Sequence, residues 1–254
     1  MKAIFLTSSL GCSIKANGKK IVTNCDNSNG FVDELKRHIC KIDNLVYVAS
    51  DPFAFDISDE KCKFIAKGLT LDGFDVNKAV VIDDRFKGNI KKQLLSADVI
   101  FLAGGHVPTQ NNYFKQIGLK EILQNYDGIV IGQSAGSMNS ASIVYCQPEY
   151  EEELLNKNFQ KRLTGLGLTD IMLMPHMNRA KIDTLLGKTT YQLCLEDSFD
   201  FPHYGIEDGG FIEIVNGVAT AYGKTVFIKN GFETVLCENG QKIVIEDKQL
   251  KLEK

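Results

Sequence analysis

The sequence predicts an α/β protein in which a mostly parallel sheet carries helices on both faces. Short apolar runs without polar alternation recur in the first half of the chain, as in strands that are buried on both faces. Segments with apolar residues at helical spacing separate these runs, as crossover helices separate parallel strands. In the last third, Asn-Gly pairs flanked by short apolar runs predict antiparallel hairpins.

The predicted parallel strands and their helices alternate in the order of the chain. We expect strands at residues 2–7, 45–49, 79–82, 99–103 and 129–131. Residues 11–30 are rich in turn formers and predict a loop. We expect helices at residues 31–39, from Asp56 or Ser58 to residue 69, at 88–97 and, as one or two helices, at 109–126.

The pattern changes in the second half of the chain. The acidic, polar residues 147–165 predict a loop with a short helix, followed by a strand at 171–174 and a short helix at 178–187. Asn216-Gly217 and Asn230-Gly231 each lie between two short apolar runs and predict two hairpins. With a further strand at 242–245, they form a predicted antiparallel extension at about 211–250.

Composition limits the class of protein. A chain of 254 residues, 44% hydrophobic and 24% charged, resembles an ordinary soluble protein, and we predict one domain over 1–254. The net charge of −3 gives no sign of a nucleic-acid or membrane surface, and no apolar run reaches membrane-spanning length. The first apolar run is too short for a signal peptide, and the seven scattered cysteines contain no C-x-x-C pair. We therefore expect a cytoplasmic monomer or homodimer without a disulfide framework or zinc site.

The segment Gly132-Gln133-Ser134-Ala135-Gly136 is the candidate for a catalytic motif. It follows the predicted strand 129–131 and precedes Met138, Ala141 and Val144 at helical spacing. A G-x-S-x-G pattern between a strand and a helix is typical of a nucleophile elbow, where a strained turn exposes the serine. Helix-end amides at such a turn favour developing negative charge. Ser134 is therefore the candidate nucleophile.

A serine nucleophile needs a base, an orienting carboxylate and amides for the oxyanion. His176 ends the predicted strand 171–174, at the sheet edge where this architecture places functional groups. The pair Glu207-Asp208 precedes Gly209-Gly210 and offers the carboxylate, and either residue could act. The Ala135 amide and that of Gly104 or Gly105, which follow the strand 99–103, are candidates for the oxyanion hole.

Two alternatives remain open at this point. The order Ser, acid, His of α/β-hydrolases would make His203 the base and one of Asp183, Asp197 and Asp200 the acid, which indicates an esterase. A chain of the same fold could also be a non-catalytic module that binds a small molecule beside Ser134.

Four segments together resemble the S51 serine peptidases, which include peptidase E and cyanophycinase. Residues 97–106 are similar to a strand and Gly-rich turn of that family, although His106 stands where asparagine is usual. Residues 132–137 are similar to its nucleophile motif, and residues 168–178 to the segment that carries its base. Residues 205–209 are similar to its acid-glycine segment, in which the acid, here Asp208, is commonly glutamate.

This resemblance implies a fold like the class I glutamine amidotransferase domain, a flavodoxin-like architecture, and peptide hydrolysis without metal or cofactor. It implies a small peptide as substrate, as for a dipeptidase of the peptidase E type. Beside the motif residues, we expect His106, Gln133, Asn178 and Arg179 to contact the peptide. A cation would be needed for an acidic side chain, and Arg162, Arg179 and Lys181 are candidates, with Arg85 more remote.

Overall fold

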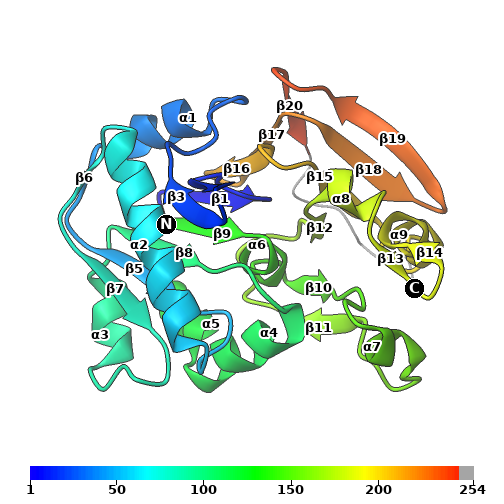
Figure 1. Cartoon of the computed structure of the whole chain (residues 1–254), viewed down its shortest axis with the longest axis horizontal. Coiled ribbons are helices and arrows are strands. Elements are labelled where there is room, and N and C mark those ends of the chain that lie inside the picture. The colour runs from blue at the N-terminus through cyan, green and yellow to red at the C-terminus, as the bar shows by residue number, and fades with distance from the viewer. Residues whose placement is uncertain (246–254) are drawn as a thin grey trace.

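The computed structural model describes residues 1–245, and its centre is an eight-stranded sheet (Figure 1). The strand order is β20-β17-β16-β1-β9-β8-β5-β7. Five neighbours are parallel: β1 (Ala3–Thr7), β9 (Ile129–Gln133), β8 (Val99–Leu102), β5 (Leu45–Val48) and β7 (Ala79–Ile82). Three are antiparallel: β16 (Phe211–Val215), β17 (Val218–Tyr222) and β20 (Lys242–Ile245). The predicted fold class, a mostly parallel sheet with antiparallel strands from the C-terminal third, is confirmed.

Alternate residues of the parallel strands enter two separate cores, because successive side chains of a strand point to opposite faces. Phe5, Tyr47 and Phe101 pack under α1 (Phe31–His38) and α2 (Phe55–Leu71). Val48, Leu102 and their face neighbours pack under α3 (Ile90–Leu95), α4 (Val107–Gln116) and α5 (Leu119–Leu123). Helices therefore cover both faces of the parallel strands, as the non-alternating apolar runs predict.

A second sheet covers the antiparallel end of the main sheet. Its strand order is β12-β15-β18-β19, with bounds Leu173–Met174, His203–Ile206, Thr225–Lys229 and Phe232–Cys237. Leu173 and Ile206 of this sheet pack against Leu6 and Ile212 of the main one. The hairpins β16–β17 and β18–β19 turn at the two predicted Asn-Gly pairs, where Asn216 and Asn230 have positive φ. Of the predicted extension 211–250, residues 246–250 lie outside the described part.

Two local predictions are wrong because short polar hairpins occupy the segments. Residues 11–30 include β2 (Ser13–Ala16) and β3 (Lys19–Val22), which pair around Asn17-Gly18. The segment 178–187 is helical only in α8 (Met177–Ala180) and then begins a hairpin of β13 (Thr184–Leu185) and β14 (Lys188–Thr189). Most residues of these short strands are exposed, so their sequences lack the apolar pattern of a buried strand.

The helix after Ser134 is also shorter than its spacing predicts. It spans only Ala135–Asn139 (α6), Ala141 then forms a bridge to Thr169, and β10 (Ile143–Tyr145) pairs with β11 (Arg162–Thr164). The helix α2 begins after Ala54 without a side-chain cap, so the predicted cap at Asp56 or Ser58 is wrong. The remaining elements are α7 (Glu151–Leu155), α9 (Thr190–Asp197), β4 (Lys41–Ile42) and β6 (Asp75–Val76).

Candidate active site

Ser134 lies in a sharp turn between β9 and α6, with φ 52° and ψ −115°. Its amide donates to the Thr7 carbonyl at 2.9 Å, which ties the turn to the neighbouring strand. A Cβ on Gly132 would lie 2.7 Å from the Ser137 nitrogen, and one on Gly136 would overlap the Leu102 carbonyl. The two glycines are therefore needed because the backbone passes so closely, and the strained turn exposes the Ser134 hydroxyl.

The side chains of Ser134, His176 and Asp208 form one hydrogen-bonded chain. His176 Nε2 lies 3.0 Å from Ser134 Oγ, and His176 Nδ1 lies 2.6 Å from Asp208 Oδ1. The hydrogen bond from His176, followed by one from Ser8, lowers the pKa of Asp208 to about 2. Asp208 is thus ionised at neutral pH, so Nδ1–H donates to it and Nε2 is left to accept the Ser134 hydroxyl proton.

Ser8 is a member of this network that the sequence did not indicate. It follows β1, is fully buried, and donates its hydroxyl to Asp208 Oδ1 at 2.7 Å. Ser8 Oγ also accepts a hydrogen bond from the His176 amide at 2.9 Å, where the backbone of His176 has a positive φ of 58°. One hydroxyl therefore fixes both the carboxylate and the backbone of the imidazole, in a segment that carries no recognisable motif.

Of the two adjacent acids, the structure brings Asp208 to His176. Glu207 instead uses its backbone, its amide donating to the Lys224 carbonyl and its carbonyl accepting from Gly210. Asn178, expected to contact substrate, forms a side-chain hydrogen bond that also lowers the pKa of Asp208. Asn178 is exposed and does not line the hollow beside Ser134, so the structure places it at the acid and not at the expected contact with substrate.

After β8, Gly104 approaches the serine turn and Gly105 approaches Ser50. A Cβ on Gly104 would lie 3.2 Å from Ser134 Cβ, and one on Gly105 would overlap the Ser50 hydroxyl. Both glycines line the hollow in which Ser134 lies, and Ala135 directly follows Ser134 at the start of α6. The structure thus brings the Gly104-Gly105 turn and the turn that carries Ser134 to the same hollow.

The hollow beside Ser134 and His176 has a volume of about 810 Å³. Three residues expected to contact substrate, His106, Gln133 and Arg179, line it. His106 is held by Thr109 Oγ1 and Glu153 Oε1, each at 2.8 Å from a ring nitrogen. Arg179 is largely exposed and lies 3.5 Å from Asp183. His106 is therefore a fixed wall of the hollow, whereas Arg179 reaches its rim.

Two further charged residues line the hollow and were not found from sequence. Lys61 of α2 is half-buried, donates to the Gly104 carbonyl at 3.3 Å, and has its pKa lowered by burial. Glu149 accepts a hydrogen bond from the Val107 amide, and partial loss of water raises its pKa, against the charges of His106 and His176. The hollow thus offers a cation and an anion of its own.

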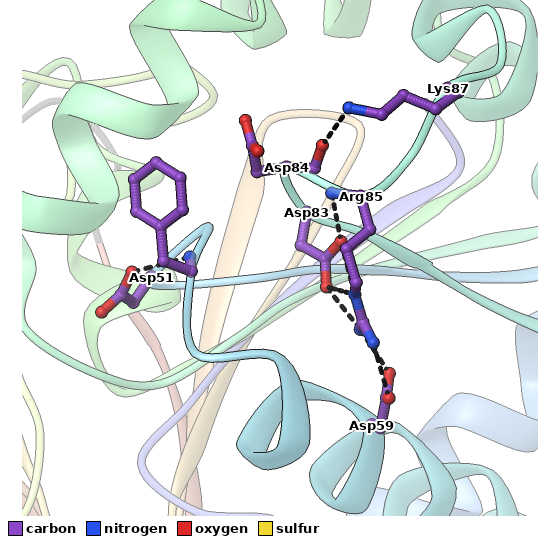
Figure 2. A network of polar contacts seen from close by, with 7 residues as sticks. Asp51, Asp59, Asp83, Asp84, Arg85 and Lys87 are labelled. Carbon is purple, nitrogen blue, oxygen red and sulfur yellow. Dashed lines mark hydrogen bonds and ion pairs between the residues drawn. The ribbon is translucent and has the colours of Figure 1, made fainter.

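Of the other residues considered from sequence, Asp183 lines the hollow beside Arg179, whereas His203, Arg85, Arg162 and Lys181 do not line it. His203 is fully buried, donates Nδ1–H to the Phe201 carbonyl at 2.7 Å and stacks on Tyr145. Burial lowers its pKa to about 4, and it does not line the hollow, where the Ser134 hydroxyl lies against His176 instead. Figure 2 shows Arg85 enclosed by Asp59 and Asp83, with charged hydrogen bonds as short as 2.7 Å.

Arg162 lies over the Phe201 ring, and Lys181 contacts Glu233 and the Tyr191 ring. Within residues 1–245, no three His, Cys, Asp or Glu side chains gather as a metal would require, and no helix is long and apolar enough to cross a membrane.

Comparison with known families decides the relationship that the four motif segments suggest. The model of Peptidase family S51 matches residues 45–222, more than half of the chain. The chain belongs to peptidase family S51. The matched S51 region contains Ser134, His176 and Asp208, and it extends from β5 to the end of β17.

Solved structures show the same fold as this S51 chain. A peptidase from an acI-B1 Actinobacterium has a TM-score of 0.62 at 16% identity, over 96% of this chain and 97% of that one. A candidate peptidase E protein from Listeria monocytogenes EGD-e has a TM-score of 0.54 at 16% identity, over 93% and 100% of the chains. No curated protein matches the sequence. Family membership supports a peptidase, and the likeness to these structures concerns the fold alone.

Proposed function

We propose that this S51 chain is a serine peptidase that hydrolyses small peptides, as a dipeptidase of the peptidase E type would. The observation that carries the proposal is the hydrogen-bonded chain from Ser134 Oγ through His176 to Asp208, at the wall of a hollow. A serine hydroxyl beside an imidazole nitrogen, with the imidazole oriented by an ionised carboxylate, is the arrangement that acyl transfer requires.

In this mechanism Ser134 Oγ attacks the peptide carbonyl carbon while His176 Nε2 takes its proton. The negative oxygen of the tetrahedral intermediate accepts hydrogen bonds from the Ala135 and Gly105 amides. His176 then gives the proton to the leaving amine, which departs and leaves an acyl-enzyme. A water molecule, which gives its proton to His176, then attacks the acyl-enzyme and releases the carboxylic acid product. Asp208 keeps His176 Nδ1 protonated throughout.

The charges of the hollow support a short, unblocked peptide as substrate. Glu149 lines the hollow with His176 and can accept a hydrogen bond from a free α-ammonium group. Lys61 donates one hydrogen bond to the Gly104 carbonyl, and its ammonium group can donate another to a substrate carboxylate. Of the cations proposed from sequence, Arg179 alone lines the hollow, where it reaches the rim.

The proposal is tested with Ser134→Ala and His176→Ala, each checked for native circular dichroism and assayed against a dipeptide library. We expect kcat/KM to fall by about 10⁴-fold or more in both. His203→Ala, assayed on dipeptides and on an ester panel, is the control for the esterase alternative. Activity that survives in Ser134→Ala, or loss of ester hydrolysis in His203→Ala alone, would overturn this assignment.

Labelling by a fluorophosphonate separates catalysis from passive binding, because the reagent reacts with an activated serine. We expect one adduct at Ser134 in the wild type and none in His176→Ala. Equal labelling of both proteins would contradict the role of His176.

Recognition of the free amine is tested with Glu149→Gln, because the neutral amide keeps the shape but loses the charge. We expect KM for unblocked dipeptides to rise about five-fold, the loss of roughly 1 kcal/mol of a screened charge pair. KM for N-acetylated dipeptides should stay unchanged, as should both values in Glu152→Gln, an exposed acid of α7. An equal rise for both substrate classes would remove Glu149 from amine recognition.

A further inference from the structure

Two buried thiols, Cys12 and Cys25, lie in contact at the base of the hairpin β2–β3. Their Sγ atoms are 2.6 Å apart, and the side chains are 4% and 5% exposed. No other pair of cysteines within residues 1–245 has a hydrogen-bonded Sγ–Sγ contact. Spacing alone does not indicate this pair, because 12 residues separate the two cysteines and five further cysteines are scattered along the chain.

The backbone around the thiols is already paired, so a bond between them needs no large movement. The Thr23 amide donates to the Cys12 carbonyl at 3.0 Å, and the Asp26 amide donates to the Leu10 carbonyl at 2.7 Å. These bonds continue the hairpin ladder in which Ser13 faces Val22. The segment that leads to Cys12 and the segment that follows Cys25 are thus antiparallel neighbours, and we call them the Cys12 arm and the Cys25 arm. A disulfide can span two such neighbouring segments.

Each thiol is also fixed against α2. A Cβ on Gly68 would lie 2.7 Å from Cys12 Cβ, so the helix can approach this cysteine only at a glycine. The Cys25 amide donates to Asp72 Oδ2 at 2.8 Å, just beyond the end of the helix. The helix therefore holds both cysteines in place from one side.

The two arms lead to the two supports of the turn that carries Asp208. The Cys12 arm begins at Ser8, whose hydroxyl donates to Asp208. The Cys25 arm continues to Asn29, whose side-chain amide donates to the Gly209 carbonyl at 3.0 Å, and Asp26 packs closely against Gly209. A covalent link between the arms would therefore join both supports of the Asp208 turn.

We propose that Cys12 and Cys25 are a modification site: they form a reversible disulfide that braces the Asp208 turn. The oxidant is a low-molecular-weight disulfide, which reaches Cys12 through a second pocket of about 150 Å³ that Cys12 lines with Lys61 and Gly104. The Cys12 thiolate attacks one sulfur of the oxidant, forms a mixed disulfide and expels one small thiolate.

Cys25 Sγ then attacks Cys12 Sγ, and the second small thiol leaves with the proton that Cys25 gives up. Two protein thiols are thereby oxidised by two electrons, and the oxidant is reduced to two thiols. The inference does not depend on the peptidase proposal, because the bond and its effect on the fold are measured without substrate.

The bond is tested on the full-length protein in oxidised glutathione, with iodoacetamide trapping and tryptic mass spectrometry. Trypsin cuts after Lys15, Lys19 and Lys20, so peptides 3–15 and 21–36 stay together only through a Cys12–Cys25 bond. We expect this linked pair, and its release by dithiothreitol. Glutathione on the exposed Cys40 without the linked pair, or a different pairing, would overturn the proposal.

The stabilising effect of the disulfide on the Asp208 turn is tested by comparing the oxidised and reduced proteins. Closing a loop of this length should raise Tm by about 5 °C. Amide hydrogen exchange in residues 207–210 should slow in the oxidised form. Both effects should vanish in Cys12→Ala and in Cys25→Ala, and persist in Cys62→Ala, a buried cysteine of the same core. A disulfide that forms but leaves amide hydrogen exchange at residues 207–210 unchanged would disprove its effect on the Asp208 turn.

Discussion

The two ends of the His176 hydrogen-bond chain are held in different ways. At one end, Ser134 follows a buried central strand, and its turn is fixed by close backbone packing at Gly132 and Gly136. At the other end, Asp208 lies in a turn between β15 and β16 and is fixed by side chains from distant segments, Ser8 and Asn178.

This difference explains why the sequence indicates what holds the Ser134 turn but does not indicate what holds the Asp208 turn. Backbone packing at a tight turn restricts the residue types within a few positions, so the glycines form a local pattern. Support by side chains from distant segments produces no pattern near Asp208 in the sequence. Ser8 contacts Asp208 only because the fold brings the two residues together. Substitutions at Asp208, Gly136 and Ser8 separate the two kinds of support.

The largest effect is expected when the acid itself is removed. On the proposed mechanism, Asp208→Asn lowers kcat/KM by about 10³- to 10⁴-fold, because a neutral amide no longer fixes the imidazole tautomer. The matched change Glu207→Gln should alter it less than about three-fold, since Glu207 holds its place through its backbone. Steady-state assays on one dipeptide measure both. An equal loss in Glu207→Gln would mean that the acids exchange roles.

The next effect concerns the backbone packing at the nucleophile. Gly136→Ala would place a Cβ against the Leu102 carbonyl and should destabilise the fold by about 3 kcal/mol. Gly217→Ala, where a Cβ meets no atom within 4 Å but φ is +75°, should cost about 1 kcal/mol from backbone strain alone. Urea unfolding measures the loss of unfolding free energy in both variants. Equal losses would show that the backbone around Gly136 shifts to make room for the added Cβ.

A smaller effect is expected from removing the distant support of the acid. Ser8→Ala should lower kcat by about 10- to 100-fold with little change in KM, since it removes a charge-assisted hydrogen bond behind the reacting groups. Ser9→Ala, one residue along the same segment, is the control and should keep full activity. If Ser8→Ala retains wild-type kcat, the turn does not depend on this support.

The smallest effect is a pH dependence of stability. The pKa of Asp208 is lowered from 3.8 to about 2 in the folded protein, so its contribution is present above about pH 4 and is lost as pH falls toward 2. The difference in unfolding free energy between wild type and Asp208→Asn should therefore shrink by about 1 kcal/mol between pH 5 and pH 2, allowing for solvent screening. A difference that is constant with pH would show that the charge of Asp208 does not stabilise the fold.

The sequence predicts the fold class because burial on both faces requires non-alternating apolar strands, and the five parallel strands carry that pattern. It also locates Ser134, His176 and Asp208, which the structure brings together. Their catalytic roles and the one-domain organisation stay predictions.

The sequence prediction fails where structure depends on long-range packing or on polar hairpins. Asn17-Gly18 carries the same turn signal as Asn216-Gly217, but its strands are exposed and lack apolar runs, so the hairpin β2–β3 was missed. Lys61 and Glu149 were missed for another reason: their roles in the hollow arise from the meeting of α2 and the segment before α7.

The position of β1 has a consequence for how the protein folds during synthesis. The first strand of the chain pairs on one side with residues 129–133 and on the other with residues 211–215. One edge of β1 can therefore pair once residues 129–133 have left the ribosome, but the other edge must stay unpaired until residues 211–215 follow, which leaves it open to wrong pairing for longer. Ser8 and Asp208 can meet only at that later stage, so the hydrogen-bonded chain around His176 is incomplete until residue 208 has emerged.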